Sequence, residues 1–209
     1  MGKFLMLKEK MIEMAYPLSE VVSHLENNPN LTSEMFEILY SKYTAFASLD
    51  ILLQHSKLTD EWFLKILKDY LQSPKWLASN PHLTRFQIDT LLTVDWRGYG
   101  SNVTEYEYDV RTELAKHATL NEAQYKQIYD YGLSAGGGAT LRYLAQNPNL
   151  TARQITQLAG IMSMKKILQM RLAQFSKLTD EMFTRFLPLY PIELSKNEQL
   201  TPVQIEAIY

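Results

Sequence analysis

The chain has 209 residues with a net charge of -2, and 46% of its residues are hydrophobic. This composition is typical of a globular chain and argues against wholesale disorder. The chain contains no cysteine, which excludes a disulfide framework, a thiolate metal site and a cysteine nucleophile. No apolar run reaches the roughly 18 residues of a membrane span, and the first residues lack a signal-peptide pattern. We therefore expect a cytoplasmic chain without a membrane segment.

The first predicted element is a helix over residues 3–15, where leucine, methionine and isoleucine stand among lysine and glutamate. Pro17 follows this segment. Apolar residues at helical spacing indicate an amphipathic helix, and proline ends it. We expect residues 1–16 to form an N-terminal capping helix. Residues 17–209 then form one helical repeat domain with an insertion at 96–109.

A Leu-Thr or Leu-Asn dipeptide recurs in this domain at intervals of 22 to 37 residues. Its leucines are Leu31, Leu58, Leu83, Leu120, Leu150, Leu178 and Leu200. The Thr or Asn is a favoured helix N-cap, and four units add glutamine at the capping-box spacing. These glutamines are Gln87, Gln124, Gln154 and Gln204. Apolar residues five and eight positions after each leucine share one helix face, so each unit is predicted to begin with a helix A.

Each unit also closes in a regular way. Six residues before the next Leu-Thr or Leu-Asn dipeptide stands another leucine, often followed by alanine. Three residues before the same dipeptide stands Asn, His or Phe. Asparagine tolerates the left-handed conformation at a helix end, and proline follows it in three units. The pattern predicts a shorter helix B that ends in Leu-Ala-x-Asn-Pro.

The motif Leu-Ala-x-Asn-Pro-x-Leu-Thr, present at 77–84 and 144–151, resembles the leucine-rich variant repeat and, more broadly, HEAT-type helical repeats. The resemblance covers residues 17–209. It implies an all-α fold, a right-handed α-solenoid of about six to seven irregular two-helix repeats. It also implies scaffold and interaction roles rather than one chemistry.

The insertion at 96–109 is the main irregularity and is rich in aromatic, glycine and acidic residues. Trp, Tyr and Arg are enriched at binding hot spots, so the insertion is a candidate anchor for a protein partner. In an extended segment its acids and tyrosines would face opposite sides. The candidate residues are Trp96, Arg97, Tyr99, Glu105, Tyr106, Glu107 and Tyr108. The alternative is an ordinary loop whose tyrosines fold back onto the repeats.

A second feature is the absence of Asp and Glu between Asp130 and Asp180. A basic zone over 131–179 would attract phosphate or an acidic protein surface, so nucleic-acid binding is the alternative function. Its candidate residues are Arg142, Arg153, Lys165, Lys166 and Arg171. The other interpretation is a solvated face.

Catalytic patterns are weak throughout. The four histidines lack metal-ligand spacing, and His55 and His117 stand in the asparagine column, where capping is the simpler explanation. The glycines at 136–138 lack the lysine of a phosphate-binding loop, which favours a flexible connection. We predict no metal and no cofactor, and a hydrolase or transferase is the least favoured class. The prediction is a non-enzymatic module that binds a protein partner, with a bacterial or phage inhibitor or adaptor as one setting.

Overall fold

A computed structural model describes residues 58–69, 74–94, 103–134 and 137–208. The chain divides into two compact units, Met1–Thr59 and Asp60–Tyr209, and the fold below is that of the second. The predicted capping helix lies outside the described residues. Every regular element in the described ranges is helical, which confirms the all-α class.

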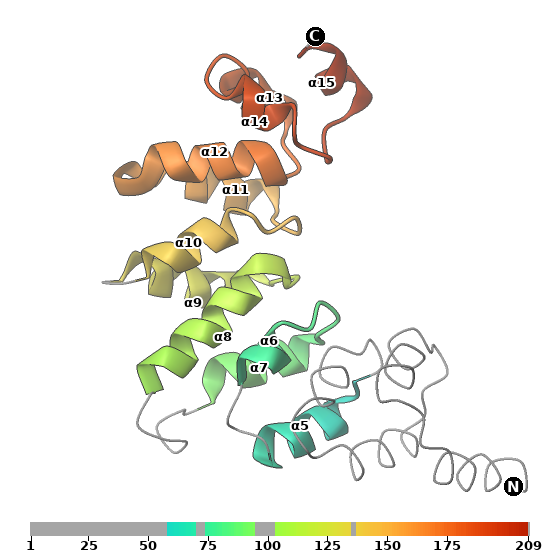
Figure 1. Cartoon of the computed structure of the whole chain (residues 1–209), viewed down its shortest axis with the longest axis vertical. Coiled ribbons are helices and arrows are strands. Elements are labelled where there is room, and N and C mark those ends of the chain that lie inside the picture. Colours follow the sequence, from blue (N-terminus) through green and yellow to red (C-terminus); the bar gives the residue numbers. More distant parts are fainter. Residues whose placement is uncertain (1–57, 70–73, 95–102, 135–136, 209) are drawn as a thin grey trace, which may run out of the picture. The chain divides into compact units, whose positions relative to one another are not determined.

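The helices alternate between two sets, which we call A helices and B helices (Figure 1). The A helices are α5 (Asp60–Asp69), α7 (Arg85–Thr93), α9 (Glu122–Leu133), α11 (Ala152–Ala159), α13 (Asp180–Phe186) and α15 (Pro202–Glu206). The B helices are α6 (Pro74–Ala78), α8 (Val103–His117), α10 (Gly138–Leu144), α12 (Lys165–Phe175) and α14 (Pro191–Leu194), with the 3-10 turn η2 (Met162–Met164) before α12. Each B helix contacts the next B helix along the chain, so the B helices form one row.

The predicted N-caps are confirmed in five A helices. The side chains of Thr84, Asn121, Thr151, Thr179 and Thr201 accept hydrogen bonds from backbone N–H groups of the first turn. All four predicted capping boxes are also present, because the glutamine at the third helical position accepts the N–H of the cap residue. Such caps stabilise a helix by about 1 kcal/mol each.

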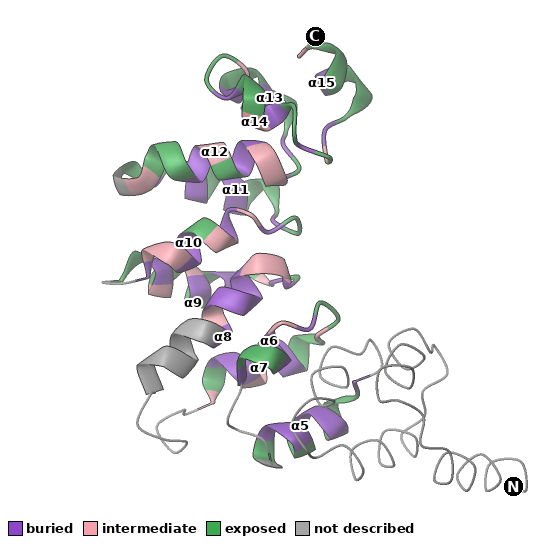
Figure 2. Ribbon diagram, in the orientation of Figure 1, coloured by how far each residue is buried: buried purple, intermediate pink, exposed green. Residues whose placement is uncertain are grey.

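The apolar columns predicted for the A helices form the core (Figure 2). The first contains Phe63, Ile88, Tyr125, Ile155 and Phe183, and the second contains Ile66, Leu91, Ile128, Leu158 and Phe186; all ten are buried. The helix B leucines and the alanines beside them are buried too, which lets neighbouring helices approach closely. In the last A helix, Ile205 of the first column is exposed.

Buried asparagine side chains connect successive units. This is a second role for the asparagine column, which the sequence predicts only as the end of its own helix B. The Nδ2 of Asn147 donates to the carbonyl of Ala118, and the Nδ2 of Asn197 donates to the carbonyls of Ala173 and Ser176. Each of these carbonyls belongs to the end of the preceding unit's B helix or the residues just after it. The asparagine column therefore satisfies carbonyl groups that a helix end leaves unpaired.

Candidate protein-binding surface

The insertion lies only partly within the described residues. Residues 96–102, with the candidates Trp96, Arg97 and Tyr99, lie outside them. Residues 103–109 belong to the long helix α8, so Glu105, Tyr106, Glu107 and Tyr108 lie on a helix rather than on an extended strand. Their side chains are outside the described set. The extended alternation of acidic and aromatic faces is therefore wrong, because the 3.6-residue period of a helix distributes consecutive residues around its axis.

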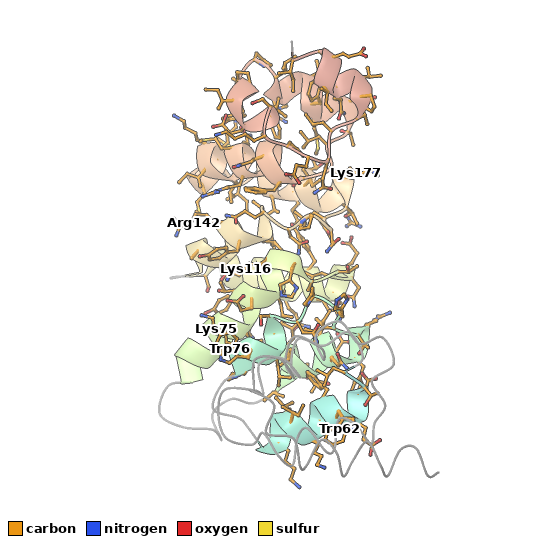
Figure 3. All side chains as sticks on the ribbon, turned by 45° about the vertical axis from the view of Figure 1, so that its right-hand side comes forward. Trp62, Lys75, Trp76, Lys116, Arg142 and Lys177 are labelled. Carbon is orange, nitrogen blue, oxygen red and sulfur yellow. The ribbon has the colours of Figure 1, made fainter. Side chains whose placement is uncertain are left out.

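Another set of aromatic and basic side chains gathers on the B helices. Lys75 and Trp76 lie on α6, Lys116 lies near the end of α8, and Arg142 and Tyr143 lie on α10. Figure 3 shows Lys75, Trp76, Lys116 and Arg142 along the same side of these stacked helices. Trp76 is 41% exposed, which is unusual for so large an apolar side chain. We call these five residues the B face.

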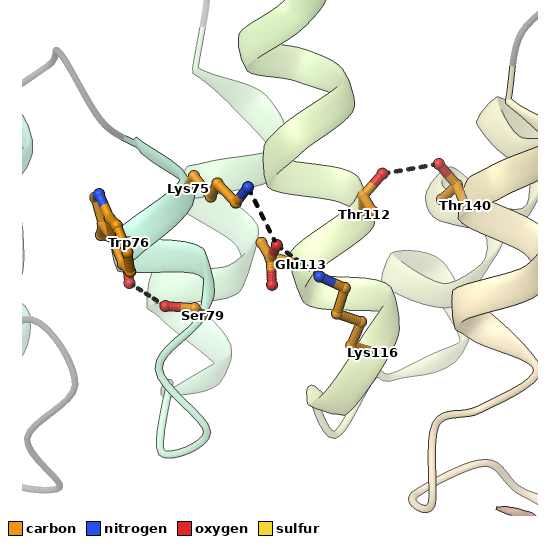
Figure 4. A network of polar contacts seen from close by, with 7 residues as sticks. All are labelled: Lys75, Trp76, Ser79, Thr112, Glu113, Lys116 and Thr140. Carbon is orange, nitrogen blue, oxygen red and sulfur yellow. Dashed lines mark hydrogen bonds and ion pairs between the residues drawn. The ribbon is translucent and has the colours of Figure 1, made fainter.

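A buried carboxylate organises the B face (Figure 4). The Oε1 of Glu113 on α8 lies 2.7 Å from the Nζ of Lys116 and 3.9 Å from the Nζ of Lys75. The residue Glu113 is 8% exposed, whereas the two lysine side chains reach solvent. Because ionised carboxylates are rarely buried unless paired, the two lysines account for the position of Glu113. The carboxylate in turn draws cations of α6 and α8 toward one point.

Two further contacts join α8 to α10. The Lys116 Nζ lies 4.7 Å from the ring centroid of Tyr143, within the range of a cation–π interaction. The hydroxyls of Thr112 and Thr140 form a buried hydrogen bond of 3.1 Å between the same helices (Figure 4). The B face is therefore presented by three helices whose relative positions are fixed by polar contacts as well as by the core.

The basic residues predicted from the acid-free zone are all exposed but lie in two places. Arg142 lies on α10, and Lys165, Lys166 and Arg171 lie on α12, so four of the five are in the row of B helices. Arg153 lies on the A helix α11 and is separated from that row. The guanidinium of Arg171 lies 6.0 Å from the ring centroid of Phe175.

His117 ends α8 on the same helix as Lys116. Neither nitrogen of its imidazole makes a hydrogen bond to a described residue, so the ring does not cap its helix. Burial lowers the pKa of His117, and Lys116 lowers it further, whereas the nearby Ala78 carbonyl and Glu113 oppose the shift. No group of three or more possible metal ligands occurs in the described ranges.

The glycine-rich connection has a steric explanation at one position. A Cβ on Gly137 would lie 2.1 Å from the carbonyl oxygen of Tyr131, which no side chain tolerates. The backbone of the connection is therefore closely packed at Gly137, although the sequence favours a flexible connection there.

Sequence reasoning missed the B face, although a signal for it exists. Lys75-Trp76 and Arg142-Tyr143 occupy the same two positions, directly before the helix B leucine of their units. A cation followed by an aromatic residue in one repeated column indicates a shared surface once the helix is assigned.

Comparison of the chain with protein-family models, curated proteins and solved structures gave no match. Among the helices that the structure describes, none combines the length and the apolar character needed to cross a bilayer.

Proposed function

We propose that the chain is a non-enzymatic helical-repeat module that binds a protein partner. In this proposal its paired helices form a right-handed α-solenoid of about six to seven irregular repeats, completed at the start by the capping helix at 1–16. The partner lies across the B helices, and the insertion at 96–109, which includes the start of α8, contributes a second contact. An inhibitor or adaptor role in a bacterial or phage setting is consistent with this proposal.

The observation that carries the proposal is the combination of residue types on the B face. Trp76 and Tyr143 offer large apolar surfaces with few rotatable bonds, and Lys75, Lys116 and Arg142 lie on the same three helices, with Lys116 over the Tyr143 ring. Aromatic residues and arginine dominate the energetics of protein interfaces, because they bury much area at a low entropic cost. Since the Thr112–Thr140 bond and the packing of α6, α8 and α10 already join the three helices, their backbones need little reordering on binding.

The test uses the immobilised full chain to capture partners from a lysate of the source cells, followed by mass spectrometry. A Trp76→Ala, Tyr143→Ala variant should lose the captured protein, because it removes both aromatic anchors. The matched control is Phe86→Ala on the A helix α7, since Phe86 is 47% exposed and also aromatic. This control should capture the same protein as the unmodified chain.

Retention of every captured protein by the double variant would contradict a role for the B face. A second variant, with Trp96, Tyr99, Tyr106 and Tyr108 replaced by Ala, measures the contribution of the insertion. Far-UV circular dichroism of each variant confirms that the helices are intact.

Nucleic-acid binding remains the second candidate, and four exposed cations on α10 and α12 favour it. Contacts to phosphates release counterions, so the logarithm of the affinity should fall linearly with the logarithm of the salt concentration. Replacing Lys165, Lys166 and Arg171 by Glu should then abolish a gel shift that the unmodified chain gives at low salt. The absence of any gel shift at low salt would exclude this candidate.

A further inference from the structure

A shallow groove of about 770 Å³ lies where η2 and the start of α12 face the turn between α13 and α14. Its walls include Met162, Ile167 and Leu189, which are 78%, 45% and 58% exposed. Single exposed apolar residues are normal, but several gathered around one hollow mark an interaction site. The B face does not include this groove, which is formed further along the chain.

The floor of the groove is held in place by buried contacts. The Nε2 of Gln169 donates to the carbonyl of Ala159, and its Oε1 accepts the hydroxyl of Tyr190 at 3.1 Å. The Tyr190 ring packs edge-to-face on Phe186, with ring centroids 5.8 Å apart. Gln169 and Tyr190 both line the groove, so this part of it is already ordered before a ligand arrives.

The rim of the groove is positively charged. Lys165 and Lys166 line it, both are exposed, and neither pairs with an acidic side chain among the described residues. They occupy the first turn of α12, where the helix dipole adds a partial positive charge. On the facing side, Glu193 of α14 is close enough for its charge to act on Tyr190. Two lysines and one glutamate leave an excess of positive charge at the groove.

We infer that this groove binds a peptide segment of a protein partner in which large apolar side chains stand beside Asp or Glu. The apolar residues fill the hollow, and the carboxylates reach Lys165 and Lys166. A hollow receives protruding side chains, whereas a membrane-binding surface inserts its own apolar residues into the lipid. Nucleic acid has no apolar side chain to place against Met162 and Leu189. The inference rests on the proposed protein-binding function and specifies the chemistry of one contact.

The experiment selects random 12-residue peptides, displayed on phage, for binding to the full chain. We expect the enriched peptides to carry Asp or Glu next to Leu, Ile, Phe or Met. Affinities of these peptides, measured by fluorescence polarisation, should fall at least about tenfold, or 1.4 kcal/mol, for the Met162→Ser, Leu189→Ser variant and for the Lys165→Glu, Lys166→Glu variant. Matched controls are Val203→Ser, an exposed apolar residue on α15, and Arg153→Glu, an exposed cation on α11. Both controls should bind like the unmodified chain.

Several results would overturn the inference: no enriched peptide, enriched peptides without acidic residues, or equal binding to the groove variants. Vesicles of phosphatidylcholine with phosphatidylserine, and a single-stranded DNA oligonucleotide, are tested in parallel. If either binds through Lys165 and Lys166 while no peptide does, the inference is wrong and the groove serves that other ligand. The proposed function is tested separately: it fails when the immobilised full chain captures no protein, and the role of the B face fails when the B-face variant retains every captured protein.

Discussion

Gln124 and Gln154 occupy the same position in successive A helices but differ in their bonds. Each accepts the N–H of its own cap residue, Asn121 or Thr151. The Nε2 of Gln124 also donates to the Asp89 carboxylate at 2.8 Å and to the Arg85 carbonyl at 3.2 Å. The Nε2 of Gln154 is buried without a partner among the described residues. The preceding helix α9 has Glu122 and Lys126 where α7 has Arg85 and Asp89.

Replacing each glutamine by methionine, which is similar in size, separates these roles. Both variants lose the capping-box bond, but only Gln124→Met leaves the Arg85 carbonyl and Asp89 without their donor. We expect Gln124→Met to reduce the free energy of unfolding by about 1–2 kcal/mol more than Gln154→Met. Urea denaturation followed by circular dichroism measures the difference. Equal losses would show that the bonds between units contribute little.

His117 stands where Asn147 and Asn197 make bonds to the preceding unit. Because burial lowers its pKa in the folded chain, the unfolded chain binds more protons. Stability should therefore fall as the pH decreases through about 6.5, the ordinary histidine value, and level off below the folded pKa. The nearby Glu113 reduces this effect and Lys116 increases it.

The variant His117→Asn should abolish this contribution and leave the stability less sensitive to acid. Thermal unfolding at pH 7.5 and pH 5.5 gives the comparison, with the exposed His82→Asn as the control. The loss between the two pH values should be smaller in His117→Asn than in the control. An identical loss in both would mean that the His117 imidazole is protonated freely in the folded chain.

At the scale of the element, a glycine lets the connection between α9 and α10 pass close to the backbone at the end of α9. A Cβ at Gly137 would meet backbone atoms, the Tyr131 oxygen at 2.1 Å and the Gly132 Cα at 2.7 Å, which cannot rotate away. A Cβ at Gly138 would meet only the Met164 side chain, with the sulfur at 3.5 Å and Cε at 3.7 Å. Two adjacent glycines therefore face different constraints.

We expect Gly137→Ala to reduce the free energy of unfolding by about 1–3 kcal/mol, because the backbone must shift. Gly138→Ala should be neutral or stabilising by up to about 1 kcal/mol, since alanine is the better helix former. Differential scanning calorimetry of the two variants tests this pair. A stable Gly137→Ala chain would show that the connection adjusts without cost.

The helix starts were predictable because each depends on residues close together in sequence. Thr84 and Gln87 form their capping box within four residues, and Ile88 and Leu91 follow at helical spacing. The boundaries of α8 were not predictable in this way. Residues 105–109 alternate with a period of two, yet they continue the helix that buries Val110 and Leu114. Packing of the later turns outweighs the local alternation.

At the scale of the whole molecule, contacts run mainly between neighbouring helices, from α6 through α8, α10 and α12 to α14. In a linear stack, a defect near the end affects the end alone, whereas a central defect affects both sides. Leu144 on α10 and Leu194 on α14 are both completely buried and fill the same column. They form a matched pair for testing how far a defect spreads.

Replacing either leucine by alanine should cost about 2–5 kcal/mol locally. We expect Leu194→Ala to increase amide hydrogen exchange in α13, α14 and α15 while α8 and α9 keep their protection. Leu144→Ala should increase exchange on both sides of α10. Uniform loss of protection in the Leu194→Ala chain would indicate one cooperative core instead of a stack.

The candidate sites were less predictable than the helices, because they depend on contacts between units. Lys75 and Glu113 are far apart in the chain, and only the packing of α6 on α8 brings them together. The groove similarly combines Met162 with Leu189. The basic residues of the acid-free zone are exposed, and their division between A and B helices follows from the fold.

The glutamine bonds also have a consequence for engineering new chains from these units. Gln87 donates to Asp60 and Gln204 donates to Asp180, each acceptor being the first residue of the preceding A helix. The helix α13 has Met182 at the glutamine position, and the helix before it begins with Ala152, so donor and acceptor are missing together. A shuffled or duplicated unit should thus keep this bond only behind a neighbour that supplies an aspartate acceptor, as the unit of Gln154 already shows by lacking one. Where these bonds between units occur, they favour the existing order of the units.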